Sequence, residues 1–258
     1  MPEPLLGLAA GLGIGALLGV LLTTVGLVWY KKSRPYRFIL DGMANNNELC
    51  LIFIRHVFIE DATPGTTPLR ERLPRYGSTV AVSNVRDLCA DVDGIALANV
   101  LNVLGHAGKT ENMRIIRTSD DRGEWNGHLI VIGGESQQSC DFCSSMQPIF
   151  YRLSSTDIYD TTEDCCIPRE HGFVYGVILK ARNPQRAGRP GVALLIGGLG
   201  AGGTEAASYY LREHLDELGR EFGCNCFGVV LRASVATGVQ STERLVQYDR
   251  VEKELYEY

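Results

Sequence analysis

VALLIGGLGAGGT, residues 192–204, is the stretch that decides the fold class. Its five leading apolar residues, several of them branched, predict a strand that is buried on both faces. A glycine-rich turn follows, and Thr204 is then expected to cap a helix that runs to about Leu218. A second apolar strand is predicted over 226–231. This succession of strand, helix and strand is typical of a parallel βαβ unit.

Outward from this unit, the same alternation extends over most of the chain. Residues 48–59 are apolar and β-branched, which fits either a strand or a short buried helix. Further strands are predicted over 79–83, 113–117, 128–132 and 173–181, a helix over 91–104, and a charged tail helix over 242–258. We therefore expect an α/β fold with a Rossmann-like, mostly parallel sheet and helices on both faces.

The N-terminal stretch from Leu5 to Tyr30 carries no charged residue. As a helix it would rise about 39 Å, enough to cross the ~30 Å hydrocarbon core of a bilayer. It ends in Trp29-Tyr30, and a basic cluster follows at Lys31, Lys32, Arg34 and Arg37, as is typical of a cytosolic exit. A secretory signal peptide is the alternative, but residues 1–4 lack its basic start. The sequence predicts a single-pass membrane protein with its N-terminus outside and residues 31–258 in the cytosol.

Three regions follow from this interpretation. Residues 1–36 are the expected transmembrane anchor and basic flank, 37–78 a connector and strand, and 79–258 a cytosolic α/β domain. Within the anchor, glycines recur every fourth residue, on one face of the predicted helix: Gly7, Gly11, Gly15 and Gly19. Such a face lets a second helix approach closely, so we expect a homo-oligomer. The alternative is that glycine is simply frequent in membrane helices.

The charge of the chain excludes one class of partner. The net charge is −5, with 25 Lys and Arg against 30 Asp and Glu, and the basic residues do not cluster in the predicted domain. Because nucleic-acid binding requires a basic surface, nucleic acid is not an expected partner.

The glycine-rich turn is the first candidate binding site. Gly198, Gly200 and Gly203 match G-x-G-x-x-G after a strand and before a helix, the context in which that motif binds phosphate. Gly202 and Thr204 would complete the loop, and Arg232, at the end of the next strand, suits an additional phosphate. The ribose-binding acid of dinucleotide enzymes is missing there, and no Gly-Lys-Ser/Thr follows as in a Walker loop. The alternative is a tight turn whose glycines only permit close packing.

A second glycine-rich turn follows the strand over 128–132. Gly133, Gly134 and Ser136 lie there, and ligands of open α/β sheets collect at the carboxyl ends of strands. The two turns are expected either to face one crevice or to be independent of each other.

The cysteines and histidines give weaker signals. Cys140-x-x-Cys143 is half of a zinc site, but the pair Cys165-Cys166 does not repeat its spacing, so these four are weak metal candidates and free thiols are favoured. A triad of Ser136, Asp164 and His171 can be drawn, but its roles require geometry that spacing does not supply. No catalytic residue is predicted.

The order of these motifs resembles a loosely defined group of uncharacterised bacterial α/β domains that follow a helix-turn-helix module or a membrane segment. The motifs are the helix sequence GIALANVL at 94–101, the Ile132-Gly133-Gly134 strand end, the strand at Tyr175, and 195–207. The resemblance covers about 79–232 and implies a regulatory or ligand-sensing module. The chain departs from the group in its cysteines and at Gln137-Gln138, where the group often has an asparagine.

Together these features predict a membrane-anchored cytosolic sensor of a small phosphorylated or nucleotide ligand that signals through assembly. The alternatives are a membrane-anchored nucleotide-processing hydrolase or NAD(P)-dependent enzyme, and a structural membrane adaptor without a ligand.

Overall fold

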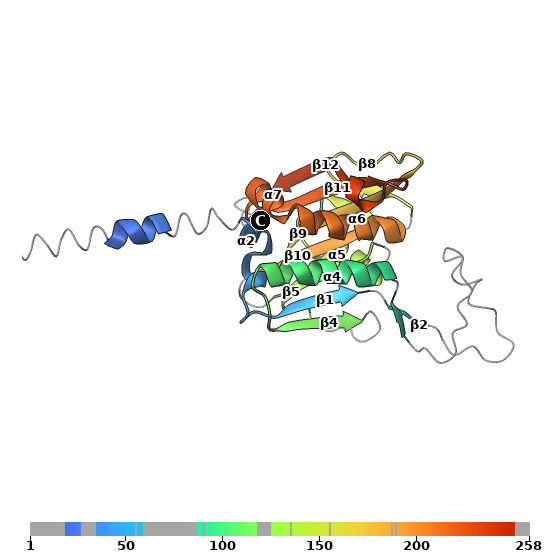
Figure 1. The fold of residues 1–258 in the computed structure, drawn as a ribbon. Helices are drawn as coiled ribbons and strands as arrows, with labels where there is room; N and C mark the ends of the chain where they lie inside the picture. Colours follow the sequence, from blue (N-terminus) through green and yellow to red (C-terminus); the bar gives the residue numbers. More distant parts are fainter. Residues whose placement is uncertain are drawn as a thin grey trace, which may run out of the picture.

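A computed structural model describes residues 19–26, 35–54, 56–58, 87–89, 91–117, 125–134, 136–154, 156–186, 188 and 190–250. Its centre is a seven-stranded sheet in the order β12-β11-β9-β10-β5-β1-β4 (Figure 1). The strands are β1 (Cys50–Ile54), β4 (Met113–Arg117), β5 (His128–Ile132), β9 (Phe173–Asn183), β10 (Gly191–Gly198), β11 (Cys226–Ser234) and β12 (Glu243–Arg250). Two small sheets pair β2 (His56–Phe58) with β3 (Asp87–Cys89), and β6 (Tyr151–Leu153) with β7 (Ile158–Asp160) and β8 (Cys165–Cys166).

The sheet is mixed, so the prediction of a Rossmann-like, mostly parallel sheet is wrong. Strands β10, β5, β1 and β4 are parallel, but β9 pairs antiparallel with both β10 and β11, and β12 pairs antiparallel with β11. The connection between Asn183 and Gly191 is too short for the dozen or more residues that a parallel crossover requires. Strands β9 and β10 therefore form a hairpin, and β9 lies between the two strands of the predicted βαβ unit.

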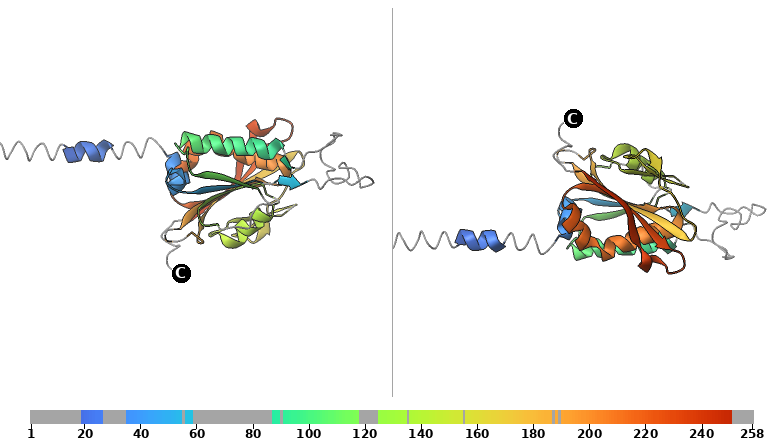
Figure 2. Two further views of the ribbon diagram at one scale, coloured as in Figure 1. Left: turned by 90° about the horizontal axis from the view of Figure 1, so that it is seen from below. Right: turned by 90° about the horizontal axis from the view of Figure 1, so that it is seen from above.

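Helices cover both faces of the sheet (Figure 2). One face carries α2 (Tyr36–Leu40), α4 (Asp91–His106), α6 (Gly200–Glu213) and α7 (Leu215–Phe222), with the 3-10 turns η1 (Asp41–Ala44) and η2 (Val239–Ser241) beside them. The other face carries α5 (Gln137–Ser145) and the small β6-β7-β8 sheet. Alternate strand residues divide between two apolar cores, so Ile130 packs under the helices of the first face while Val131 packs under the second.

Several predicted elements are confirmed. Strands β4 and β5 have the predicted bounds, and α4 extends the predicted 91–104 helix by two residues. The apolar residues at 48–59 form β1 and then β2. The predicted helix to Leu218 is present but is divided at His214 into α6 and α7. The predicted strand over 79–83 lies outside the described residues.

The predicted tail helix is wrong. Residues 243–250 form strand β12, and the remaining residues of that prediction, 251–258, lie outside the described part of the chain. Arg244, Val246 and Tyr248 are partly buried while Leu245 and Gln247 are exposed, so the accessibility alternates with a period of two. That period belongs to a strand with one covered face rather than to a helix.

The predicted transmembrane anchor also requires correction. Within the residues that the structure describes, no helix is long and apolar enough to cross a membrane. Of the predicted span, the structure describes only the helix over 19–26, which would rise about 12 Å, and residues 1–18 and 27–34 lie outside the described part. This finding overturns the predicted single-pass topology and, with it, the cytosolic placement.

Candidate functional site

The predicted glycine loop is a point where two backbones pack closely. A Cβ at Gly203 would overlap the carbonyl oxygen of Tyr175 in β9, and a Cβ at Gly198 would lie 2.5 Å from the same oxygen. A Cβ at Gly176 would lie 2.5 Å from the carbonyl oxygen of Gly203. These glycines let the start of α6 lie directly on β9, which favours the packing interpretation for Gly198 and Gly203.

The N-cap residue of α6 supplies no side-chain cap. Leu199 is the N-cap residue and supplies no capping hydrogen bond, and no acidic residue lies in the first turn of this fully described helix. The prediction that Thr204 caps α6 is wrong, because Gly200 (φ 71°) starts the helix four residues earlier and takes a backbone conformation that favours glycine. Gly200 and Gly202 are partly exposed, whereas Gly203 and Thr204 are buried. In the glycine-rich loop, the residues from Gly200 to Gly202 are therefore more open to a ligand than Gly203 and Thr204.

The second glycine turn lies against the first. Strands β5 and β10 are neighbours, and a Cβ at Gly134 would overlap the carbonyl oxygen of Gly198. The Gly133 amide donates a 2.9 Å hydrogen bond to Ile196. Ser136 is buried and caps α5, where its Oγ accepts a 3.2 Å hydrogen bond from the backbone amide of the third residue after it. The two turns are thus side by side, but Gly134 and Gly198 are in direct backbone contact rather than across a crevice.

Arg232 is held by two carboxylates. Its Nη1 lies 2.7 Å from Glu170 Oε1 and its Nε lies 2.7 Å from Glu243 Oε1. The guanidinium also lies over the ring of Phe173, 5.0 Å from its centroid. Arg232, predicted as a phosphate contact, is therefore already paired within the fold.

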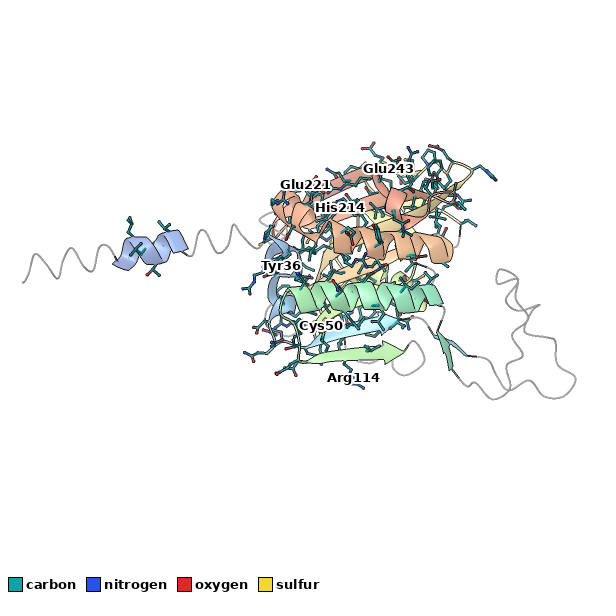
Figure 3. All side chains as sticks on the ribbon, in the orientation of Figure 1. Tyr36, Cys50, Arg114, His214, Glu221 and Glu243 are labelled. Atoms are coloured by element: carbon teal, nitrogen blue, oxygen red, sulfur yellow. The ribbon has the colours of Figure 1, made fainter. Side chains whose placement is uncertain are left out.

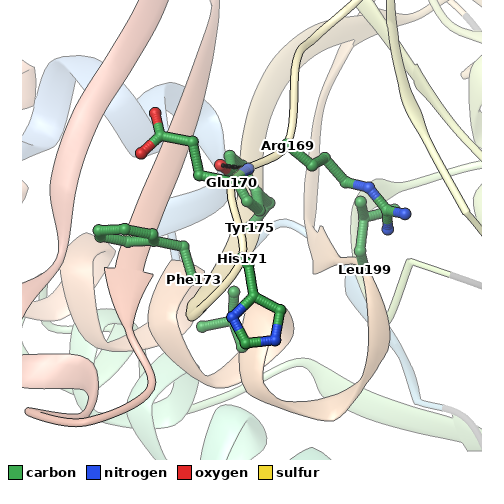
Figure 4. Close-up of a pocket in the computed structure, with 7 residues that line it drawn as sticks. Arg169, Glu170, His171, Phe173, Tyr175 and Leu199 are labelled. Atoms are coloured by element: carbon green, nitrogen blue, oxygen red, sulfur yellow. Dashed lines mark hydrogen bonds between the residues drawn. The ribbon is translucent and has the colours of Figure 1, made fainter.

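A pocket of about 250 Å³ opens beside the N-cap of α6 (Figure 4). It is lined by the loop before β9, the first residues of β9, and the residue after β10: Arg169, Glu170, His171, Phe173, Val174, Tyr175 and Leu199. Because β9 runs antiparallel to β10, the first residues of β9 lie beside the last residues of β10, at the carboxyl end of β10. The pocket thus lies where ligands of open α/β sheets collect.

The two charged side chains of the pocket loop differ in their partners. In Figure 4 the side chains of Arg169 and Glu170 extend in opposite directions from the pocket loop. Glu170 is paired with Arg232. In the part of the chain that the structure describes, the Arg169 guanidinium has no carboxylate or hydrogen-bond partner, and its side chain is exposed. Among the described residues that line this pocket, the charge without a partner is therefore positive.

Tyr175 connects the two walls of the pocket. Its hydroxyl accepts a 2.8 Å hydrogen bond from the Glu170 amide, and its carbonyl oxygen accepts a 2.9 Å hydrogen bond from the Leu199 amide. Tyr175 is 2% exposed, so its side chain has little freedom to leave this position. This residue fixes the loop that carries Arg169 relative to the start of α6.

Sequence analysis missed Arg169 and Glu170. They follow a long, weakly patterned segment, and nothing local to them indicates a site. The only signal was the charged run Arg169-Glu170-His171 directly before an apolar strand. The run indicates a site only when β9 is known to be antiparallel to β10, because that direction places the run near the end of β10.

The remaining candidates lie apart from this pocket. Of Ser136, Asp164 and His171, only His171 lines it. Among the described residues no group of three His, Cys, Asp or Glu side chains is arranged to hold a metal ion. Cys140 is exposed on α5 and Cys165 and Cys166 are exposed on β8, while burial raises the pKa of the Cys143 thiol to about 11.

Of the four regularly spaced glycines predicted to mediate self-association, the structure describes only Gly19. Gly7, Gly11 and Gly15 lie outside the described residues. Gly19 is an exposed helical residue, and a Cβ there would meet no atom within 4 Å. Four apolar side chains of the same short helix are 58–69% exposed: Val20, Leu21, Leu22 and Val25.

With the fold and the pocket described, the chain is defined as a mixed α/β protein with a seven-stranded mixed sheet. No protein-family model matches the chain, and no curated protein matches it.

Proposed function

We propose that the protein is a sensor that binds a compact anion, of the class of phosphorylated small molecules, in the pocket beside α6. The observation that carries this proposal is the exposed Arg169 guanidinium, which has no partner among the described residues and lines the same pocket as Leu199, the N-cap residue of α6. Both features attract negative charge, and they converge on one cavity.

The attraction has two physical sources. An arginine binds phosphate through charge-assisted hydrogen bonds, often two at once. The start of a helix offers backbone amides and the positive end of the helix dipole, which contributes roughly 0.3–1 kcal/mol near a surface. The N-cap residue of α6 supplies no side-chain cap and its first turn carries no acid, so the helix itself places no negative charge where an anion would bind.

The size of the pocket favours a small ligand. Its volume of about 250 Å³ is below the ~300–1,000 Å³ of pockets that hold drug-sized molecules. A dinucleotide would extend far beyond this pocket. At Gly198 and Gly203 of the loop that would hold it, backbone atoms already occupy the space beside the glycine. An NAD(P)-dependent enzyme therefore receives less support than a receptor for a phosphate monoester of modest size.

We propose that the signal passes through α6 and α7 to the N-terminal segment. The ligand would contact the start of α6, and α7 continues from α6 to Phe222. Gly219 of α7 packs against Pro35, directly before α2, so the N-terminal segment is attached to the far end of the same pair of helices. We propose that ligand binding alters assembly through this attachment, with the apolar helix over 19–26 as the associating segment.

The proposal is tested with inorganic phosphate and a panel of sugar and nucleoside monophosphates. A ligand that binds only the folded protein raises its stability by RT ln(1 + [L]/Kd), about 2.7 kcal/mol at 100 times Kd. We expect thermal stabilisation without turnover, lost in Arg169→Gln. The matched control is Arg114→Gln, because Arg114 is an exposed arginine on the edge strand β4, at the opposite edge of the sheet from Glu243 (Figure 3). If the ligand stabilises Arg169→Gln as much as wild type, the proposed site is wrong. If the protein hydrolyses a phosphate ester, it is an enzyme rather than a sensor.

A further inference from the structure

We infer that Arg232 is a positioning residue for the proposed anion pocket, which it keeps open by holding the carboxylate of Glu170 away from Arg169. This inference rests on the proposed function. It gives Arg232, which does not line the pocket, a role that acts through Glu170.

The geometry fixes Arg232 from three sides. Its guanidinium makes 2.7 Å contacts with both Glu170 and Glu243 and lies on the ring of Phe173, 5.0 Å from the centroid. Glu243 is the first residue of β12, so the guanidinium spans from the edge of the sheet to the pocket loop. The side chain of Arg232 is only 24% exposed, which limits the alternative directions that it can take.

Among the described residues that line the pocket, Glu170 is the only acidic one. It is next to Arg169 in sequence, and its backbone amide is anchored to the Tyr175 hydroxyl at 2.8 Å, so its side chain always starts from the rim of the pocket. The carboxylate itself is 60% exposed and is held by Arg232 rather than by packing. Without Arg232 the carboxylate is free to rotate, and the guanidinium of the adjacent Arg169 has no partner among the described residues.

A freed Glu170 would weaken anion binding in two ways. It would compete directly for the Arg169 guanidinium, and its negative charge would repel the ligand. Exposed ion pairs are weak, so the competition is modest, and we expect a loss of about two- to fivefold in affinity. By pairing with Glu170, Arg232 thus prevents this carboxylate from competing with the ligand for Arg169.

The test compares five proteins by isothermal titration with inorganic phosphate: wild type, Arg169→Gln, Arg232→Gln, Glu170→Gln and the double variant Arg232→Gln/Glu170→Gln. Arg232→Gln is expected to bind about two- to fivefold more weakly, and Glu170→Gln as tightly as wild type or more tightly. The double variant is expected to recover the wild-type affinity, because it has no carboxylate to block the pocket. Loss of a structural contact would not be rescued by removing Glu170.

The outcomes separate the inference from the proposed function. If the double variant binds as weakly as Arg232→Gln, Arg232 acts directly or through the fold, and the inference is wrong while the pocket stands. If Arg169→Gln binds phosphate as well as wild type, or wild type does not bind it, the proposed function fails and the inference with it. Arg232→Lys, which keeps the charge but not the forked geometry, is expected to bind between wild type and Arg232→Gln.

Discussion

The carbonyl oxygen of Tyr175 in β9 accepts a 2.9 Å hydrogen bond from the amide of Leu199, the N-cap residue of α6. The same oxygen occupies the position that a Cβ of Gly203 would take. One backbone atom thus sets both where α6 begins and how closely it lies on the sheet. The glycine-rich sequence is required for this contact whether or not a ligand binds beside it.

Gly203→Ala is therefore expected to destabilise the protein. Alanine normally stabilises a helix relative to glycine by about 0.5–1 kcal/mol, but here the added methyl group collides with backbone that has no rotamer to change. We expect a net loss of about 1–3 kcal/mol in the free energy of unfolding, measured by urea denaturation. Gly94→Ala is the matched control, since Gly94 is exposed in α4 with no atom near its Cβ, and it should stabilise. Equal effects of the two substitutions would contradict the packing interpretation.

His128 leads to a prediction about pH. Its Nδ1 accepts a 2.9 Å hydrogen bond from the Val192 amide, and its Nε2 lies 3.2 Å from the guanidinium of Arg186. The imidazole is 2% exposed. Burial, and then the charge of Arg186, lower the pKa of His128 from 6.5 to about 4. The folded protein therefore keeps this histidine neutral.

Stability should consequently fall as the solution becomes acidic. Between pH 6.5 and about 4 the unfolded chain binds a proton at His128 that the folded chain does not. The neutral His128 therefore costs no stability above pH 6.5, and the free energy of unfolding decreases as the pH falls toward 4. The loss is at most about 1.4 kcal/mol per pH unit, or about 2 kcal/mol at pH 5. Urea unfolding at pH 7.5 and pH 5 measures it. In His128→Gln the free energy of unfolding should differ less between the two pH values than in wild type. In the control His106→Gln, at an exposed histidine, the difference should equal that of wild type. An unchanged difference in His128→Gln would assign the acid sensitivity to other groups.

A buried polar contact between α4 and α6 gives a prediction about specificity of packing. Asn99 donates a 3.1 Å hydrogen bond to Ser208 Oγ and accepts a 2.7 Å hydrogen bond from Arg212. Asn99→Ala leaves the Ser208 hydroxyl and the Arg212 guanidinium without this partner, and should cost about 1–3 kcal/mol. A double-mutant cycle with Ser208→Ala should give a coupling energy of about 0.5–1.5 kcal/mol. Additive losses would mean that the two side chains contribute independently.

The sequence predicted elements whose signal is local and missed features that depend on pairing. Strands β4 and β5 were predictable because each is a short branched run that ends at a polar or glycine residue. The direction of β9 was not, because an apolar strand reads the same whether its neighbour is parallel or antiparallel. That one direction brings Arg169 to Leu199, so the pocket was missed together with it. Arg232 was predicted at the right end of β11, but its partners Glu170 and Glu243 come from distant segments that no spacing rule connects.

Gly219→Ala tests the proposed route from the pocket to the N-terminal segment. A Cβ at Gly219 would overlap the carbonyl oxygen of Pro35, so alanine should displace α2 from α7. The pocket is at the start of α6, more than fifteen residues away, so the affinity for inorganic phosphate should stay at the wild-type value. Sedimentation velocity with and without phosphate then measures assembly. We expect phosphate to change the sedimentation of wild type and of Gly105→Ala, an exposed glycine of α4 with no atom near its Cβ, but not of Gly219→Ala.

The reason for this expectation is that allosteric coupling requires an element that both sites contact. The α6–α7 pair is such an element, because its N-cap residue Leu199 lines the pocket and Gly219 contacts the residue before α2. Separating α2 from α7 removes the second contact and leaves the first intact, so binding and assembly should become independent. A Gly219→Ala protein that binds phosphate normally and still responds to it in sedimentation would show that the signal does not travel through this packing, and the assembly proposal would then need another route.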